Sequence, residues 1–213
     1  MTVKTFAFLL TGLIMMACQR KTEQIGPIPN YDSLRIALEK MHDEDQEIRR
    51  ILVDSIGFDS PEAGYYIKRM QQVDARNQDN IKVILQRYGW IPKSKIGVKA
   101  SEAFFYIVQH SDVELMEKYF PEFKRLAGIG EADPVHAAMM EDRLLMWKGH
   151  KQLYGTQAGD FRPDKKMAIW PIEDPEHVNE RRRKIGFTKT VEEYAKDIEA
   201  TYDPNEQVPV TDQ

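Results

Sequence analysis

Cysteine is almost absent from this chain, because Cys18 is the only one in 213 residues. A disulfide needs two cysteines, so the fold cannot depend on an internal disulfide. An excess of positive charge is also absent, since the formal net charge is −4 at pH 7. Nucleic-acid binding depends on clustered positive charge, and we therefore predict no nucleic-acid partner. The basic run at residues 181–184 has acidic neighbours and is typical of a solvated helix face.

The common catalytic and cofactor motifs are missing as well. There is no GxSxG, no phosphate-binding P-loop and no GxGxxG. Glu39-x-x-His42 is the only Glu-x-x-His motif, whereas a di-iron bundle needs two of them. Four of the five histidines have polar neighbours and are predicted to lie at the surface, which leaves His110 as the one plausible inward histidine. We therefore predict no metal site and no cofactor.

A long hydrophobic run occurs only at the N-terminus, where thirteen residues from Thr5 to Ala17 carry no charge. A membrane-spanning helix needs about 20 residues, so this run, which follows Lys4, favours a signal peptide. Met15-Met16-Ala17-Cys18 resembles a lipobox, the signal for cleavage and lipidation at a cysteine. An ordinary secretory signal is the alternative. The resemblance implies a membrane attachment through a lipid on Cys18, and Gln19 favours the outer membrane of a Gram-negative bacterium.

The rest of the chain reads as one domain with flexible ends. Residues 1–17 are the predicted signal peptide, and residues 18–30 are the lipidated cysteine with a polar tether that contains Gly26, Pro27 and Pro29. Residues 31–202 form the predicted helical domain. Residues 203–213 contain two prolines and little that can be buried, so we expect a disordered tail.

Apolar residues recur at helical spacing along most of the domain. The predicted helices are 31–55, 60–88, 98–110, 112–127, 133–148, 174–186 and 190–201. Pro121 lies within the fourth of these and is expected to kink or split it. The stretch near 154–172 is expected to form a small β-hairpin or an ordered loop. The fold class is therefore all-α, a multi-helix, bundle-like single domain.

Three of the apolar stripes are interrupted by one polar residue each, at Asp45, Asn77 and Asp142. A carboxylate buried without a partner costs several kcal/mol, so we expect partners near these residues. Arg49 and Arg143 are close in sequence to the two aspartates. The expectation is a single polar pocket, which is either a functional site or a structural hydrogen-bond network.

The candidate site residues follow from this pattern. The candidate acid–base residues are His110, Asp142 and Asp45. The candidate ligand-binding residues are Arg49, Asn77, Arg143, Gln152, Tyr154 and Gln157. The preferred hypothesis is a binding or scaffolding domain for a small ligand or an envelope protein, and the alternative is an envelope hydrolase or lyase.

Several short motifs occur in a distinctive order. They are Asp45-Gln46 with Arg49, Asp74-x-x-Asn77, Gly89-Trp90 with Pro92, Gln109-His110, Asp142-Arg143, Gln152-x-Tyr154-Gly155-Thr156-Gln157, Pro171, Asp174-Pro175, Arg182 and Gly186. This order resembles an uncharacterised bacterial family, a domain of unknown function. The resemblance extends over roughly residues 45–194 and implies no activity. Ile91 separates Trp90 from Pro92, whereas the family usually has Pro directly after Trp.

Overall fold

The structure is a computed structural model, and it describes residues 29–209. The described chain is all-α, with eight α-helices and one very small sheet, as the sequence predicted. The predicted signal peptide, Cys18 and most of the tether lie outside the described residues. Within them, no helix is long and apolar enough to cross a membrane.

The helices follow the predicted order closely. They are α1 (Tyr31–Arg50), the π-helix η1 (Ile51–Ile56), α2 (Ala63–Tyr88), α3 (Lys93–Ile96), α4 (Val98–Gln109), α5 (Val113–Gly128), α6 (Pro134–Trp147), the 3₁₀ helix η2 (Pro175–His177), α7 (Val178–Ile185) and α8 (Val191–Asp197). Strands β1 (Ala158–Gly159) and β2 (Ala168–Ile169) pair antiparallel.

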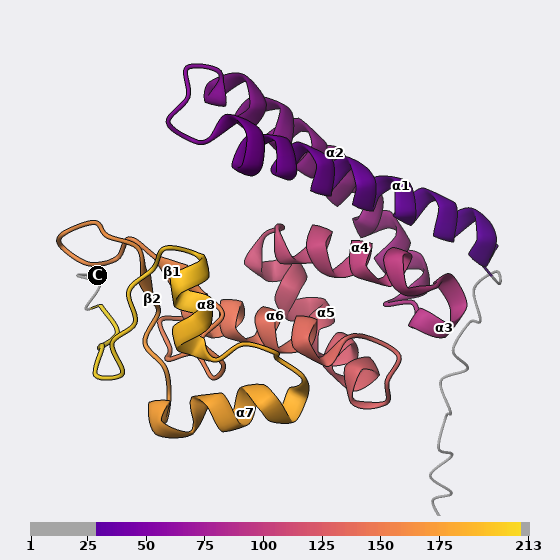
Figure 1. Ribbon diagram of the computed structural model, residues 1–213. Coiled ribbons are helices and arrows are strands. Elements are labelled where there is room, and N and C mark those ends of the chain that lie inside the picture. The colour runs from indigo at the N-terminus through magenta and orange to yellow at the C-terminus, as the bar shows by residue number, and fades with distance from the viewer. Residues whose placement is uncertain (1–28, 210–213) are drawn as a thin grey trace, which may run out of the picture.

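Helices α1 and α2 form a long antiparallel hairpin at one side of the molecule (Figure 1). Asn30 caps α1 by accepting a hydrogen bond from the Ser33 N–H. Helix α1 continues into η1, which ends at Gly57, where φ is +78°. π-Helical turns are rare and are often found near functional sites. Here the π-helix begins two residues after Arg49, one of the candidate site residues.

The main hydrophobic core lies between this hairpin and the α5–α6 pair, and α4 runs through it. Helix α4 is buried nearly all round, as its apolar sequence predicts. Trp90 is 2% exposed and stacks on Phe123 with the ring centroids 4.1 Å apart. The Glu122 carboxylate accepts a hydrogen bond from the Trp90 N–H. The Gly-Trp motif therefore has a packing role at the end of α2.

The predicted split at Pro121 is wrong, because α5 runs unbroken from Val113 to Gly128. Proline cannot donate a hydrogen bond to the carbonyl four residues earlier, which here belongs to Glu117. Pro121 and Glu117 are both exposed, so water can satisfy that carbonyl.

The predicted surface position of His136 is also wrong, since its ring stacks on the buried Phe105 with the ring centroids 4.1 Å apart.

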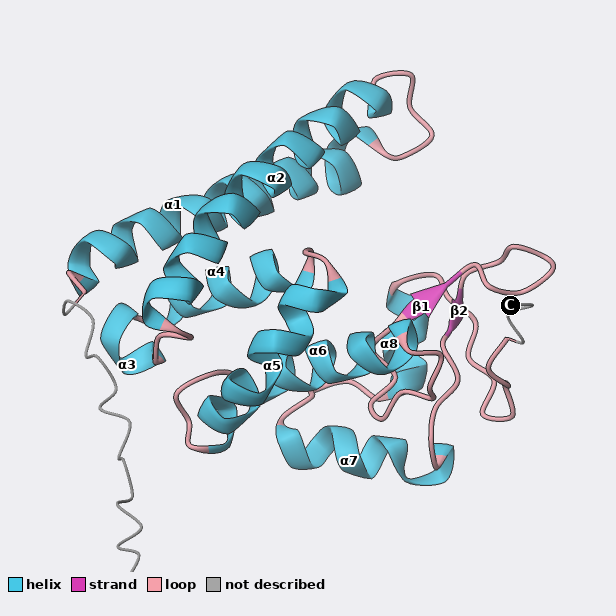
Figure 2. Ribbon diagram, turned by 180° about the vertical axis from the view of Figure 1, so that it is seen from behind, coloured by secondary structure: helices cyan, strands magenta, loops and turns pink. Residues whose placement is uncertain are grey.

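The C-terminal elements form a smaller second layer. Helix α7 lies on the far side of the α5–α6 pair from the long hairpin, and the two short strands lie beside α8 (Figure 2). A separate apolar cluster joins these elements; its buried members are Ile169, Ile172, Val178, Val191 and Ala195. In the expected tail, Glu206 accepts hydrogen bonds from Arg162 and so contacts the loop between the strands.

Candidate functional site

Asp142 holds the loop that carries the Tyr-Gly-Thr-Gln motif. Its carboxylate is 0% exposed and accepts five hydrogen bonds, of 2.7 to 3.2 Å, from Leu153 N–H, Tyr154 N–H and the N–H and hydroxyl of Thr156. Burial raises the pKa of Asp142 to about 6, and the hydrogen bonds from the loop oppose this rise. Both carboxylate oxygens accept hydrogen bonds from the loop, so Asp142 has a structural role here. We call Asp142 and the loop at residues 153–157 together the clasp.

Gly155 explains why this motif needs glycine. Its φ is +69°, and an added Cβ would lie 2.6 Å from Val191 Cγ2 and 2.8 Å from Ile172 Cδ1. The left-handed conformation favours glycine, and the close contact leaves no room for a side chain. The loop can therefore turn around Asp142 and pack against the C-terminal apolar cluster.

Two glutamines extend the clasp. The Gln152 side chain donates to the carbonyls of Gln157 and Trp170, and its oxygen accepts from the Gln157 N–H at 2.9 Å. The Gln157 amide oxygen in turn accepts from Arg143 Nε at 3.1 Å. Arg143 also donates to the carbonyl of Gln109 at 3.1 Å, which connects this clasp to the end of α4. Gln152, Gln157 and Arg143 therefore position the loop.

A second polar group lies between α1, α2 and the end of α4. Arg49 donates from Nε to both oxygens of Asp45 at 3.3 Å, and from Nη2 to Asp74 Oδ1 at 2.7 Å. Gln46 donates to Asp45 at 2.8 Å, and His110 Nδ1 lies 3.7 Å from Asp45 Oδ1. The predicted contact between Asp45 and Arg49 is present, and His110 adjoins it.

The charges in this group affect one another. Burial alone would raise the pKa of Asp45, but the contacts with His110 and Arg49 outweigh it and lower the pKa to about 2. Burial raises the pKa of Asp74, and Arg49 opposes only part of that rise. Asp45 is therefore the member that stays ionised down to a pH of about 2, and Arg49 bridges the two carboxylates.

Several polar atoms near this group have no hydrogen-bond partner among the described residues. They are the His110 Nδ1, both amide atoms of Gln109 and the Asn77 Oδ1. Asn77 makes a single long hydrogen bond, 3.3 Å to the Met41 carbonyl. The His110 carbonyl accepts from Gln78 at 2.9 Å, so the backbone is fixed while the imidazole keeps a free Nδ1.

The candidate residues thus form two groups and not the single expected pocket. Asp45, Arg49 and His110 lie together, with Asn77 nearby on α2. The clasp unites Asp142, Gln152, Tyr154 and Gln157. Arg143 is the connection between the two groups, because it contacts Gln157 on one side and Gln109 on the other.

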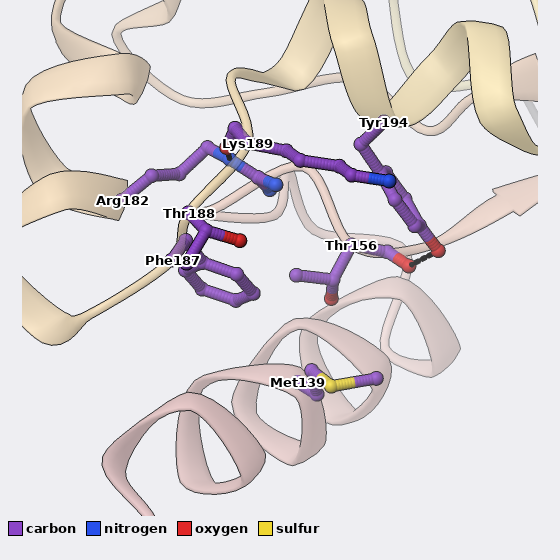
Figure 3. Close-up of a pocket in the computed structure, with 7 residues that line it drawn as sticks. All are labelled: Met139, Thr156, Arg182, Phe187, Thr188, Lys189 and Tyr194. Atoms are coloured by element: carbon purple, nitrogen blue, oxygen red, sulfur yellow. Dashed lines mark hydrogen bonds between the residues drawn. The ribbon is translucent and has the colours of Figure 1, made fainter.

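A cavity of about 130 Å³ lies beside the clasp (Figure 3). Its lining comes from α6, the clasp loop, α7, α8 and the turn between α7 and α8. The seven lining residues are Met139, Thr156, Arg182, Phe187, Thr188, Lys189 and Tyr194. The Tyr194 hydroxyl donates to the Thr156 carbonyl at 3.0 Å, so one wall of the cavity is joined to the clasp.

The prediction of a solvated face for the basic run is wrong at Arg182, which is 2% exposed. Its Nη1 donates to the Tyr154 carbonyl at 2.7 Å and its Nε to the Lys189 carbonyl at 2.9 Å. The signal was present in the sequence, since Arg182 falls between Val178 and Ile185 at spacings of four and three.

Residues 29–209 contain no group of three or more His, Cys, Asp or Glu side chains placed to hold a metal ion. What the arrangement offers instead is a preformed cavity next to a rigid loop, and a separate group with one histidine and two carboxylates. The first suits the binding of a small molecule, and the second suits the transfer of a proton.

The fold and these contacts define a helical domain with a C-terminal loop clasp. Residues 32–205 match a family of unknown function, DUF6624. The chain belongs to this family, which agrees with the resemblance seen in its motifs. No curated protein and no solved structure matches the chain.

Proposed function

We propose that the mature protein is a lipid-anchored protein of the bacterial cell envelope whose helical domain binds a small ligand. The observation that carries the binding role is the cavity beside the clasp, which is built from five separate segments of the chain. Ligand sites are typically concave, mostly apolar and formed before the ligand arrives. The five hydrogen bonds to Asp142 fix one wall of this cavity in advance.

The predicted binding residues would act mainly behind the cavity wall. Gln157 donates to the Thr156 hydroxyl at 3.0 Å, and Thr156 itself lines the cavity. Tyr154 presents its carbonyl to Arg182. Such contacts hold the lining in place and reduce the entropy lost when a ligand binds.

A library of small fragments tests the binding role. Binding is measured by thermal stabilisation of the purified protein and by its loss in the cavity-filling variant Met139→Trp. Val83→Trp, at an exposed position on α2, is the matched control for adding a tryptophan to a helix. Fragments that stabilise the wild type and the control but not Met139→Trp support the proposal. A library without such fragments contradicts it.

The anchor is proposed from the sequence motif around Cys18. More than one acyl chain makes membrane attachment stable, and lipidation at a lipobox supplies several. Labelling cells with radioactive palmitate is the test. We expect label in the wild-type protein and none in Cys18→Ser, and the wild type in the outer-membrane fraction. Equal labelling of both proteins, or none in either, contradicts the anchor.

An envelope hydrolase or lyase is the second candidate, and one contact favours it. His110 Nδ1 is 3.7 Å from the ionised Asp45 and has no hydrogen-bond partner within the described chain. A histidine next to a carboxylate can accept a proton from a substrate. The loop donors on the oxygens of Asp142 favour a structural role for this residue over an acid–base role. Turnover of cell-wall fragments that is lost in His110→Asn supports this candidate, and absence of turnover contradicts it.

A further inference from the structure

The most unusual group in the cavity is the buried guanidinium of Arg182. Among residues 29–209, no carboxylate lies within 4 Å of it, and its two hydrogen bonds go to backbone carbonyls. Its Nη2 makes no hydrogen bond within the described chain. A buried charge normally has an ionic partner, because its removal from water is costly. The carboxylates of Asp142 and Glu192 act on Arg182 only from beyond hydrogen-bonding distance, so its Nη2 is the donor that is available for an anion.

The remaining lining adds positive charge and no negative charge. None of the seven residues is an aspartate or a glutamate, whereas Lys189 is a second cation. The Lys189 ammonium pairs with Asp197, so Arg182 is the lining cation without a carboxylate partner in the described region. In Figure 3 the Thr188 hydroxyl points toward the middle of the cavity, where it can donate a further hydrogen bond.

The rest of the cavity is suited to a flat apolar body. The guanidinium carbon of Arg182 lies 4.3 Å from the centroid of the Phe187 ring and 5.6 Å from that of Tyr194. Met139 forms the opposite side, and thioethers pack well against rings (Figure 3). The volume of about 130 Å³ is close to that of an apolar cavity that holds benzene, about 150 Å³. A single ring or a short branched chain therefore fits.

We infer that the ligand is a small organic anion with one carboxylate on an apolar body about the size of a benzene ring. The carboxylate pairs with Arg182 Nη2 and accepts from the Thr188 hydroxyl, while the body packs against Phe187, Met139 and Tyr194. Guanidinium and carboxylate form strong charge-assisted hydrogen bonds. This inference rests on the proposed binding role of the same cavity and adds the chemical class of the ligand.

The test is isothermal titration calorimetry of the full-length protein in detergent with benzoate and with benzamide. The two probes have nearly the same shape, but benzamide is neutral. A hydrogen bond to a charged group contributes about 1.5–3 kcal/mol, so we expect benzoate to bind at least about ten-fold more tightly. The affinity of benzoate should also fall in Thr188→Val, which removes one donor without removing charge.

Arg182→Met is the direct variant, but it also removes two backbone contacts and can unfold the C-terminal layer. Thr188 is exposed, so Thr188→Val should not unfold this layer, and the test therefore depends on this variant. Preferential binding of benzoate that weakens in Thr188→Val supports the inference. Equal binding of both probes overturns the anion class and leaves the binding role standing. If neither probe binds, the ligand class is overturned, and the fragment library decides the binding role separately.

Discussion

Replacing Asp142 distinguishes two possible roles of its carboxylate, a structural role in the clasp and a functional role in a site. In Asp142→Asn one oxygen remains as an acceptor. The other is replaced by an NH2 group, which is itself a donor and cannot accept hydrogen bonds from the donors of the loop. At least two of the five hydrogen bonds are lost. Hydrogen bonds to a charged group contribute about 1.5–3 kcal/mol each, so we expect the free energy of unfolding to fall by about 3–6 kcal/mol.

Asp142→Leu is the more severe change, because it leaves four loop donors without an acceptor. Each buried donor left unsatisfied costs about 1–3 kcal/mol, which gives a loss of at least about 4 kcal/mol. Small domains have only about 5–15 kcal/mol of stability, so this variant should be largely unfolded or strongly destabilised at 37 °C.

Urea unfolding of residues 19–213, followed by circular dichroism, measures these losses. Asp160→Asn is the matched control, because Asp160 is exposed in the same region, and we expect a change within about 0.5 kcal/mol. An Asp142→Leu protein that unfolds at the same or a higher urea concentration than the wild type would refute the clasp. It would show that Asp142 is retained for function at a cost in stability.

Three further predictions follow from the contacts. Gly155→Ala should lower the free energy of unfolding by about 2–5 kcal/mol in urea unfolding, whereas Gly128→Ala, with open space around it, should leave it unchanged or raise it. The pKa of Asp45 is lowered from 3.8 to about 2, so its stabilising effect is complete above pH 4 and is lost as the pH falls toward 2. Acid titrations of stability should therefore show about 2 kcal/mol more loss in the wild type than in Asp45→Asn, and equal losses would contradict the ion pair. Asn77→Leu should leave the free energy of unfolding unchanged or raise it by up to about 1 kcal/mol, because Asn77 makes one long hydrogen bond and its side-chain oxygen has no partner among the described residues. A loss above about 2 kcal/mol in urea unfolding would contradict this, because it would mean that Asn77 has a further hydrogen-bond partner.

The sequence predicted the positions of the buried polar residues but not what they contact. Asp45, Asn77 and Asp142 are each at most 1% exposed, as the interrupted stripes indicated. The contact of Asp45 with Arg49 was predictable because residues four apart share a helix face. The partners of Asp142 are three backbone N–H groups and the Thr156 hydroxyl, all in a loop eleven to fourteen residues later, and helical periodicity carries no information about them.

The cavity could not be predicted from the sequence, for a similar reason. Its lining comes from segments between Met139 and Tyr194, which only the tertiary fold brings together. Arg182 belongs to a charged run, which predicts an exposed side chain, although its spacing of four residues from Val178 indicates a position on the buried face of the helix. The short helix α3 was also missed, because four residues are too few to show a periodic pattern.

The binding role of the cavity is tested most directly by NMR of protein labelled at the methionine methyl groups. Met139 lines the cavity, whereas Met70 lies on the long hairpin, where it contacts Arg49, and serves as an internal control. We predict that small fragments, benzoate among them, shift the Met139 signal in a saturable way and leave the Met70 signal in place. A Met139 signal that no fragment shifts, in a folded protein, would contradict the proposal that this domain binds a small ligand in this cavity.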